Sequence, residues 1–85
     1  DEDKKGEILD ILNSNDIDYI TFTSSSTVNN LVEIIGKENI KILEKIKTLS
    51  IGPITTETIN RLGIKLYKES ATSTIDSLVD LIIKN

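Results

Sequence analysis

The chain has 85 residues and a formal net charge of -4, and it contains neither Cys nor His. This length suits one small domain, and the missing residue types exclude disulfides, thiolate catalysis and the commonest zinc ligands. The acidic balance argues against a nucleic-acid partner, because phosphate neutralisation needs a basic face. No apolar run reaches the roughly 20 residues of a membrane span. We therefore expect a cytosolic protein with no membrane partner and no metal.

The first half of the chain is predicted to alternate between helices and strands. An apolar stripe at 8–12 indicates a helix that ends at the turn formers NSND, and the β-branched and aromatic residues that follow indicate a strand over 18–23. Apolar residues at helical spacing then predict a helix over 28–35, with Gly36 as its C-cap. A short helix over 40–46 and a buried strand over 47–51 are expected next.

The second half repeats this alternation. A helix is predicted to begin after Gly52 with Pro53 and to end at Gly63, the usual arrangement of proline at the start and glycine at the end. A third strand over 64–69 precedes a C-terminal helix that Ser73 or Thr74 would cap, with an apolar stripe at Ile75, Leu78, Val79 and Ile82. Strands separated by helices predict parallel βαβ units, so we assign an α/β fold with a three-stranded parallel sheet flanked by helices.

The three strand-to-helix junctions are rich in hydroxyl side chains. They read TSSST at 23–27, GPITT at 52–56 and SATST at 70–74, and they carry no acidic residue. In a parallel sheet such junctions meet at the carboxyl edge, where free amide groups and the positive ends of helix dipoles also point. We expect a surface for anions, phosphate or carboxylate, held by neutral donors. At any single junction, capping a helix is the more common role of Ser and Thr.

Known nucleotide motifs do not explain these junctions. The chain has no P-loop, no Rossmann glycine fingerprint and no Asp at the carboxyl end of a strand. The run TFTSSST has some likeness to the phosphate loop of flavodoxins, although it lacks glycine and flanking aromatic residues. One hypothesis is therefore a non-enzymatic flavodoxin-like module that binds an anionic ligand or FMN.

Three longer segments carry a family resemblance. The sequences ITFTSSSTVNNL, LSIGPITTETINRLGIKL and ESATSTIDSLVDLI, in this order and spacing, resemble the C-terminal part of uroporphyrinogen-III synthases. The resemblance covers about residues 16–84. Its most specific elements are FTS after a strand, the block IGPxTxxxxxxxG, and the ending (T/S)-T-I-x-x-L-V.

This resemblance implies an enzyme that cyclises hydroxymethylbilane to uroporphyrinogen III, with loss of water and inversion of ring D, and that uses no cofactor. Such enzymes have two flavodoxin-like (HemD-like) α/β domains, and the substrate lies between them. Residues 1–85 would be the C-terminal portion of one domain, without its N-terminal strands and without the second domain. We therefore expect the 85 residues to be inactive alone and to self-associate through the exposed edge of an incomplete sheet. The start at DEDKKGE, without Met, fits an excised piece.

The resemblance also implies roles for particular residues. Thr55 matches the threonine of the IGPxT block that faces the cleft, and we expect it to act as the catalytic residue, hydrogen bonding near the reacting centre. Ser24 matches the serine of FTS, and Ser26 matches the small polar residue two positions later. The candidates for holding the carboxylate arms of the substrate are Ser24, Ser25, Ser26, Gly52, Thr56 and Thr74. Tyr67 is given no catalytic role.

Overall fold

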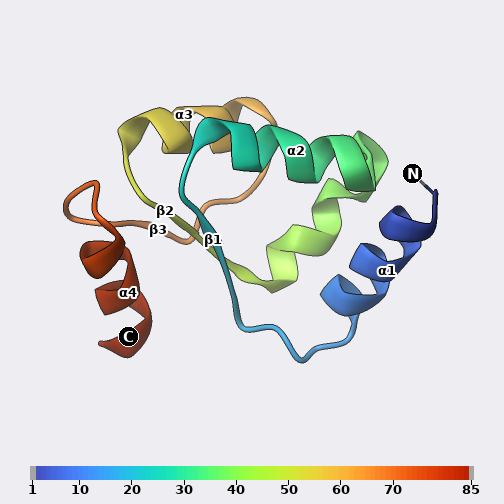
Figure 1. Ribbon diagram of the computed structural model, residues 1–85, viewed down its shortest axis with the longest axis horizontal. Coiled ribbons are helices and arrows are strands. Elements are labelled where there is room, and N and C mark those ends of the chain that lie inside the picture. The colour runs from blue at the N-terminus through green and yellow to red at the C-terminus, as the bar shows by residue number, and fades with distance from the viewer. Residues whose placement is uncertain (1, 85) are drawn as a thin grey trace.

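The computed structural model describes residues 2–84, with side chains from residue 4 onward (Figure 1). Three strands form one parallel sheet in the order β1-β2-β3. This arrangement confirms the predicted α/β fold with a three-stranded parallel sheet. Within the described residues, none of the helices is long and apolar enough to span a membrane. The elements in chain order are α1 Glu2–Asn13, β1 Tyr19–Phe22, α2 Ser25–Ile35, the 3-10 helix η1 Lys37–Lys45, β2 Lys47–Ser50, α3 Pro53–Arg61, β3 Lys68–Glu69 and α4 Ile75–Ile83.

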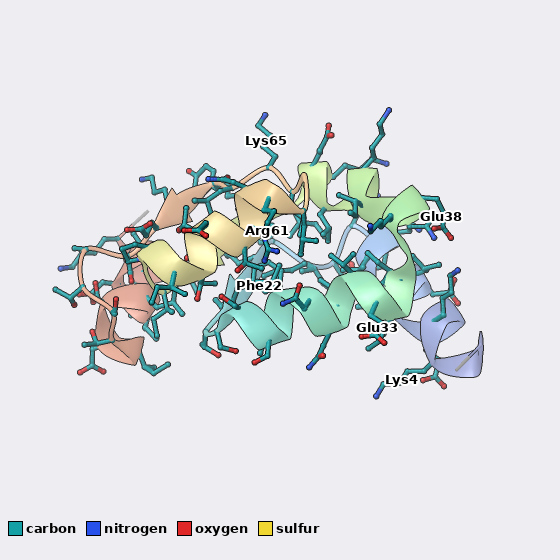
Figure 2. All side chains as sticks on the ribbon, turned by 90° about the horizontal axis from the view of Figure 1, so that it is seen from above. Lys4, Phe22, Glu33, Glu38, Arg61 and Lys65 are labelled. Carbon is teal, nitrogen blue, oxygen red and sulfur yellow. The ribbon has the colours of Figure 1, made fainter. Side chains whose placement is uncertain are left out.

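The helices lie on two sides of the sheet. In Figure 1, α2 and α3 run side by side above the strands and α4 lies below them. Figure 2 shows α2 and α3 side by side again when the molecule is seen from above. The apolar core fills the side of α2 and α3, where helices and strands pack together. Its buried members are Leu12, Phe22, Val28, Val32, Ile35, Leu43, Ile46, Ile59 and Ile64.

Helix α2 illustrates how local sequence produces this core. Val28, Val32 and Ile35 recur at helical spacing and are all buried, so one face of the helix packs against the sheet. The helix ends at Gly36, whose φ of 86° lies in a region that glycine occupies without the steric cost of a β-carbon. The helix predicted for 28–35 is confirmed, and it begins at Ser25 because Ser24 caps it.

The third strand is shorter than the predicted span of 64–69. Regular pairing with β2 is confined to Lys68 and Glu69. The hydroxyl of Thr48 donates a hydrogen bond of 2.6 Å to the carbonyl of Lys65, and the amide of Tyr67 donates to the carbonyl of Thr48 at 2.9 Å. Because a side chain binds this part of the backbone, the regular ladder starts later than the residue pattern predicts.

Helix α4 is confirmed at its predicted place, but most of its apolar stripe is exposed. Leu78 is buried, with 3% of its surface exposed, whereas Ile75, Val79 and Ile82 are 56%, 41% and 37% exposed. In the described part of the chain, α4 is the one helix below the strands, so the rest of the stripe is covered only in part. Parallel sheets are normally covered on both faces, and here the lower face is covered only in part.

Lys47, the first residue of β2, lies close to two aromatic rings. Its Nζ is 5.6 Å from the ring centroid of Tyr19 and 5.1 Å from that of Tyr67. Tyr19 and Lys47 are register partners on neighbouring parallel strands, so their side chains project from the same face. Exposed contacts of this kind contribute on the order of 0.5–1 kcal/mol. The two tyrosines therefore have a packing role at the surface of the sheet.

Candidate functional site

The three junctions meet at the carboxyl edge of the sheet, as predicted. Phe22 is the register partner of Ser50, and Ser50 is the partner of Glu69, so the three strands end side by side. Just beyond them, the amide of Ile51 donates to the carbonyl of Phe22 at 3.1 Å, and the amide of Ser70 donates to the carbonyl of Ser50 at 2.8 Å. The chain segments that leave the sheet are therefore held next to one another.

A hollow of about 280 Å³ lies where the junctions meet. Every junction contributes to its wall, so the three segments form a common surface. Thr55 belongs to this wall, and its side chain is only 4% exposed. Of the residues assigned from the sequence, Thr55 and Gly52 line the hollow. The full lining is Thr23, Ile51, Gly52, Pro53, Ile54, Thr55 and Ser73.

Gly52 allows the second and third junctions to come this close. Its φ of -177° is extended backbone that any residue adopts, so glycine is needed here because there is no room for a side chain. A β-carbon on Gly52 would collide with the Oγ of Ser73 and would lie 3.3 Å from its Cβ. Ser73 thus lies over the backbone of Gly52, and the close approach of these two residues shapes one wall of the hollow.

The first junction uses Ser24 as a helix cap. The Oγ of Ser24 accepts a hydrogen bond of 3.2 Å from the amide of Thr27, the ordinary role of an N-cap serine. The hydroxyls of Ser24 and Ser26 are 3.2 Å apart, so one of them donates to the other. Each hydroxyl has a single proton, so the pair can offer one further proton as a donor. Both residues follow Thr23, which lines the hollow, and both stand outside the lining.

Ser25 connects α2 to α3. Its Oγ accepts a hydrogen bond of 2.9 Å from the hydroxyl of Thr58 and donates at 3.3 Å to the carbonyl of Ile54. Thr58 is buried, with 5% of its surface exposed. The hydroxyl of Ser25, a candidate for substrate contact on sequence grounds, is therefore engaged within the protein. Thr58 was not foreseen, because a threonine in mid-helix has no distinctive local pattern.

The second junction is held from below by Ser50, which is fully buried. Its Oγ donates to the carbonyl of Gly52 at 2.9 Å and lies 2.8 Å from the Oγ1 of Thr56. Thr56 Oγ1 is also 2.7 Å from a carboxylate oxygen of Glu69. The three junction segments carry no acidic residue, but Glu69 at the end of β3 does bring a carboxylate to this edge. The hydroxyl of Thr56 is therefore engaged by Ser50 and Glu69, and Thr56 stands outside the lining of the hollow.

Helix α3 has the least satisfied N-terminus of the three. Gly52 occupies its N-cap position, and no side chain caps its first turn. Pro53 has no amide proton, so the first amides directed at the hollow are those of Ile54 and Thr55. Without a side-chain acceptor, these groups and the positive end of the helix dipole suit an anion. The geometry thus favours α3 among the three junctions as a place to hold negative charge.

The third junction is capped reciprocally. The Oγ1 of Thr74 accepts from the amide of Ser77 at 3.1 Å, and the Oγ of Ser77 accepts from the amide of Thr72 at 3.1 Å. Thr74, assigned from sequence as a substrate contact, therefore serves as the cap, and its neighbour Ser73 lines the hollow. Thr23 and Ser73 were missed as site residues, although both stand in the hydroxyl runs that marked this edge.

Comparison with known proteins adds independent evidence. A family model described as "Uroporphyrinogen-III synthase HemD" matches residues 1–80. The chain belongs to this family. A protein of Methanothermobacter thermautotrophicus named "Putative uroporphyrinogen-III synthase" is 43% identical to the chain over 61 residues, which cover 68% of this chain and 24% of that protein. The chain thus spans about a quarter of the length of this curated relative. No solved structure matches the chain significantly.

Membership of the uroporphyrinogen-III synthase family confirms the resemblance found in the three sequence segments. The match includes all three junctions, at 23–27, 52–56 and 70–74, so the whole hollow lies within the part of the chain that belongs to the family. The parallel α/β architecture fits the flavodoxin-like fold expected for this family. Among the described residues, no three acidic side chains form a group that could hold a metal ion.

Proposed function

We propose that this chain forms part of a uroporphyrinogen-III synthase, a cytosolic enzyme of tetrapyrrole biosynthesis that cyclises hydroxymethylbilane with loss of water and inversion of ring D. One observation carries the proposal: the three junctions meet around one hollow, beside the N-terminus of α3, which no side chain caps. Family membership supports the general function. In this proposal, residues 1–85 supply one wall of the substrate cleft.

The chemistry of the hollow suits such a substrate. Hydroxymethylbilane carries acetate and propionate arms, and carboxylates are stabilised by neutral donors and by the positive end of a helix dipole. We assign arm binding to the free proton of the Ser24 and Ser26 pair and to the amides at the start of α3. Ile54, which is 79% exposed at the rim, offers an apolar contact for a pyrrole ring. Ser25, Thr56 and Thr74 contribute by shaping the edge.

Thr55 is assigned to the reacting centre. Electron-rich pyrroles assist loss of the substrate hydroxyl themselves, so the main task of the protein is to hold the chain in a geometry that favours ring closure. A single hydroxyl in the wall of the hollow can orient the reacting ring by one hydrogen bond. Because this task needs a second wall, we propose that the 85 residues bind the substrate arms without turnover. Formation of the type III isomer by the isolated chain would overturn this part.

The test of Thr55 uses the full-length synthase that contains this segment. Thr55→Val keeps the shape of a side chain that is 4% exposed and removes only the hydroxyl. We expect kcat to fall about 10- to 100-fold, the effect of losing a hydrogen bond worth about 1.5–3 kcal/mol in the transition state. Thr21→Val, an exposed change in β1 outside the lining of the hollow, is the control. Unchanged kinetics in a folded Thr55→Val protein would remove Thr55 from the site.

An FMN-binding module remains the competing hypothesis, because an uncapped helix start among hydroxyls suits a phosphate as well as a carboxylate. Purified protein separates the two. Flavin absorbance that survives gel filtration would favour the FMN hypothesis, and saturable binding of hydroxymethylbilane by a colourless protein would favour the synthase.

We further propose that the 85-residue chain self-associates. Strand β1 stands at one end of the strand order, so in the described sheet it pairs on one side only, with β2. Such edges readily pair with another chain. The exposed apolar residues of α4 add surface that association would cover.

A further inference from the structure

Two hydroxyls join α2 to α3 at the carbonyl of Ile54, a residue that lines the hollow. Thr58 donates to Ser25 at 2.9 Å, and Ser25 donates onward to the carbonyl of Ile54 at 3.3 Å. Thr58 Oγ1 also lies 3.4 Å from that carbonyl, which makes the carbonyl a second, more distant acceptor for the same proton. We call these two residues the Ser25–Thr58 relay. It links positions 33 residues apart in the sequence.

The acceptor of the relay belongs to a particular peptide group. A peptide unit is planar and trans, so the carbonyl of Ile54 and the amide of Thr55 move together and point in opposite directions. When the carbonyl is held from the side of α2, the amide of Thr55 is held toward the start of α3, where the hollow lies. Hydrogen bonds in a chain also polarise one another, which strengthens the amide as a donor.

Apolar packing between α2 and α3 does not by itself hold the carbonyl of Ile54 in one direction. The sides of α2 and α3 that face the core meet through apolar residues such as Val28 and Ile59, which are fully buried. Apolar contacts are non-directional, so they hold two helices together without orienting a single peptide group. The relay is directional, and it acts within the first turn of α3. The backbone of α3 already directs this peptide along the helix axis, and the two hydroxyl groups add a second, directional hold on the carbonyl of Ile54 from the side of α2.

We propose that Ser25 and Thr58 are positioning residues that hold the amide of Thr55 in place to bind a carboxylate in the hollow. This inference rests on the proposed function, because it takes a carboxylate as the ligand. Ser25 thus acts from behind the peptide and does not touch the substrate. Neither residue has to reach the reacting atoms.

The test combines two measurements on the 85-residue chain. The first is the ¹⁵N chemical shift of Thr55 without ligand, which reports hydrogen bonding at the preceding carbonyl. The second is titration with succinate as the carboxylate probe, followed at the same amide. The variants are Thr58→Val, which removes the hydroxyl while keeping the shape, Thr58→Ser, which retains the hydroxyl, and Ser25→Ala. Ser25 is only half-buried, so its truncation is the variant that keeps the test available if Thr58→Val unfolds.

Thr48→Val is the matched control. Thr48 is a fully buried threonine whose hydroxyl also bonds a backbone carbonyl, that of Lys65, and it lies outside the lining of the hollow. We expect Ser25→Ala, which removes the donor to the Ile54 carbonyl, to shift the Thr55 resonance and to raise the apparent Kd for succinate about 5-fold, the loss of one hydrogen bond of about 1 kcal/mol. Thr58→Val leaves Ser25 in place, so it should change both quantities in the same direction by a smaller amount. Thr58→Ser should restore wild-type behaviour. Thr48→Val should lower stability without changing the affinity.

The outcomes separate the two claims. If Thr58→Val only destabilises the fold, as Thr48→Val does, and leaves both the Thr55 resonance and the succinate affinity unchanged, the relay is structural and the inference fails while the proposed function stands. If the wild-type amide of Thr55 does not respond to succinate, carboxylate binding at the hollow fails, and the inference fails with it.

Discussion

Replacing Gly52 with alanine tests the close approach that forms the hollow. The added β-carbon would collide with the Oγ of Ser73, and it would lie 3.3 Å from the Cβ and 4.0 Å from the Cα of that residue. Rotation of the serine side chain can move the Oγ away. The Cβ cannot rotate away, so the backbone of the third junction must shift by a few tenths of an ångström.

The size of the effect follows from these contacts. Overpacking a close contact costs about 1–3 kcal/mol, and the rotatable Oγ places this case near the lower end. Alanine also reduces the conformational freedom of the unfolded chain, which offsets about 0.4–1 kcal/mol where the native φ suits it, as the extended value at Gly52 does. The expected net loss is about 1 kcal/mol, or roughly 4–8 °C in Tm for a domain of this size.

Thermal and urea unfolding, followed by circular dichroism, measure this loss. Gly52→Ala combined with Ser73→Ala should recover part of it, because the collision with the Oγ is gone while the contact with the Cβ remains. Gly6→Ala is the control for the substitution itself. Gly6 lies inside α1, and apart from its chain neighbours and the backbone of its own helix nothing comes within 4 Å of an added β-carbon, so this variant should be more stable than wild type by about 1 kcal/mol. A Gly52→Ala protein as stable as wild type, or one that Ser73→Ala does not rescue, would refute the close packing of the two junctions.

Two further predictions concern charge and association. The pKa of Glu38 is lowered from its ordinary value of 4.5, first by a hydrogen bond to its own backbone amide and then by Lys5, whose Nζ is 3.3 Å away. The stability that ionised Glu38 contributes is therefore present above the pKa of the unfolded state and is lost as pH falls through the folded pKa. Glu38→Gln should make the free energy of unfolding fall less steeply with pH in this range. A midpoint at or above 4.5 in an NMR titration of the Glu38 carboxyl would contradict this. Light scattering should show self-association of the 85-residue chain at micromolar concentrations, and a monomer throughout would exclude it.

Much of the fold could be predicted because its signals are local. The stripe of Val28, Val32 and Ile35 and the helix boundaries at Pro53 and Gly63 depend on residues within one or two turns of each other. The structure has helices at both places, with Pro53 in the first turn of α3. Gly63 has a φ of 83°, as expected after a helix end. Such features follow from backbone sterics and periodicity, which act over a few residues.

The extent of pairing and the degree of burial could not be predicted in this way. The third strand was predicted too long, because nothing in the residue pattern over 64–69 shows that the hydroxyl of Thr48 would bind the carbonyl of Lys65. In α4, the stripe is present but only Leu78 finds a partner surface. Both outcomes depend on which parts of the chain come into contact, and local periodicity is the same in either case.

At the candidate site, the sequence by itself determined which segments carry hydroxyls and that a parallel sheet brings them to one edge. Only the tertiary structure decided what each hydroxyl does. Ser24 and Thr74 cap helices, whereas Thr23 and Ser73 line the hollow. The physical reason is that one hydroxyl group can cap a helix, join two segments or contact a ligand, and the choice is made by the partners that packing brings within hydrogen-bond distance. Ser25 shows this plainly, since its partner Thr58 lies 33 residues away on another helix.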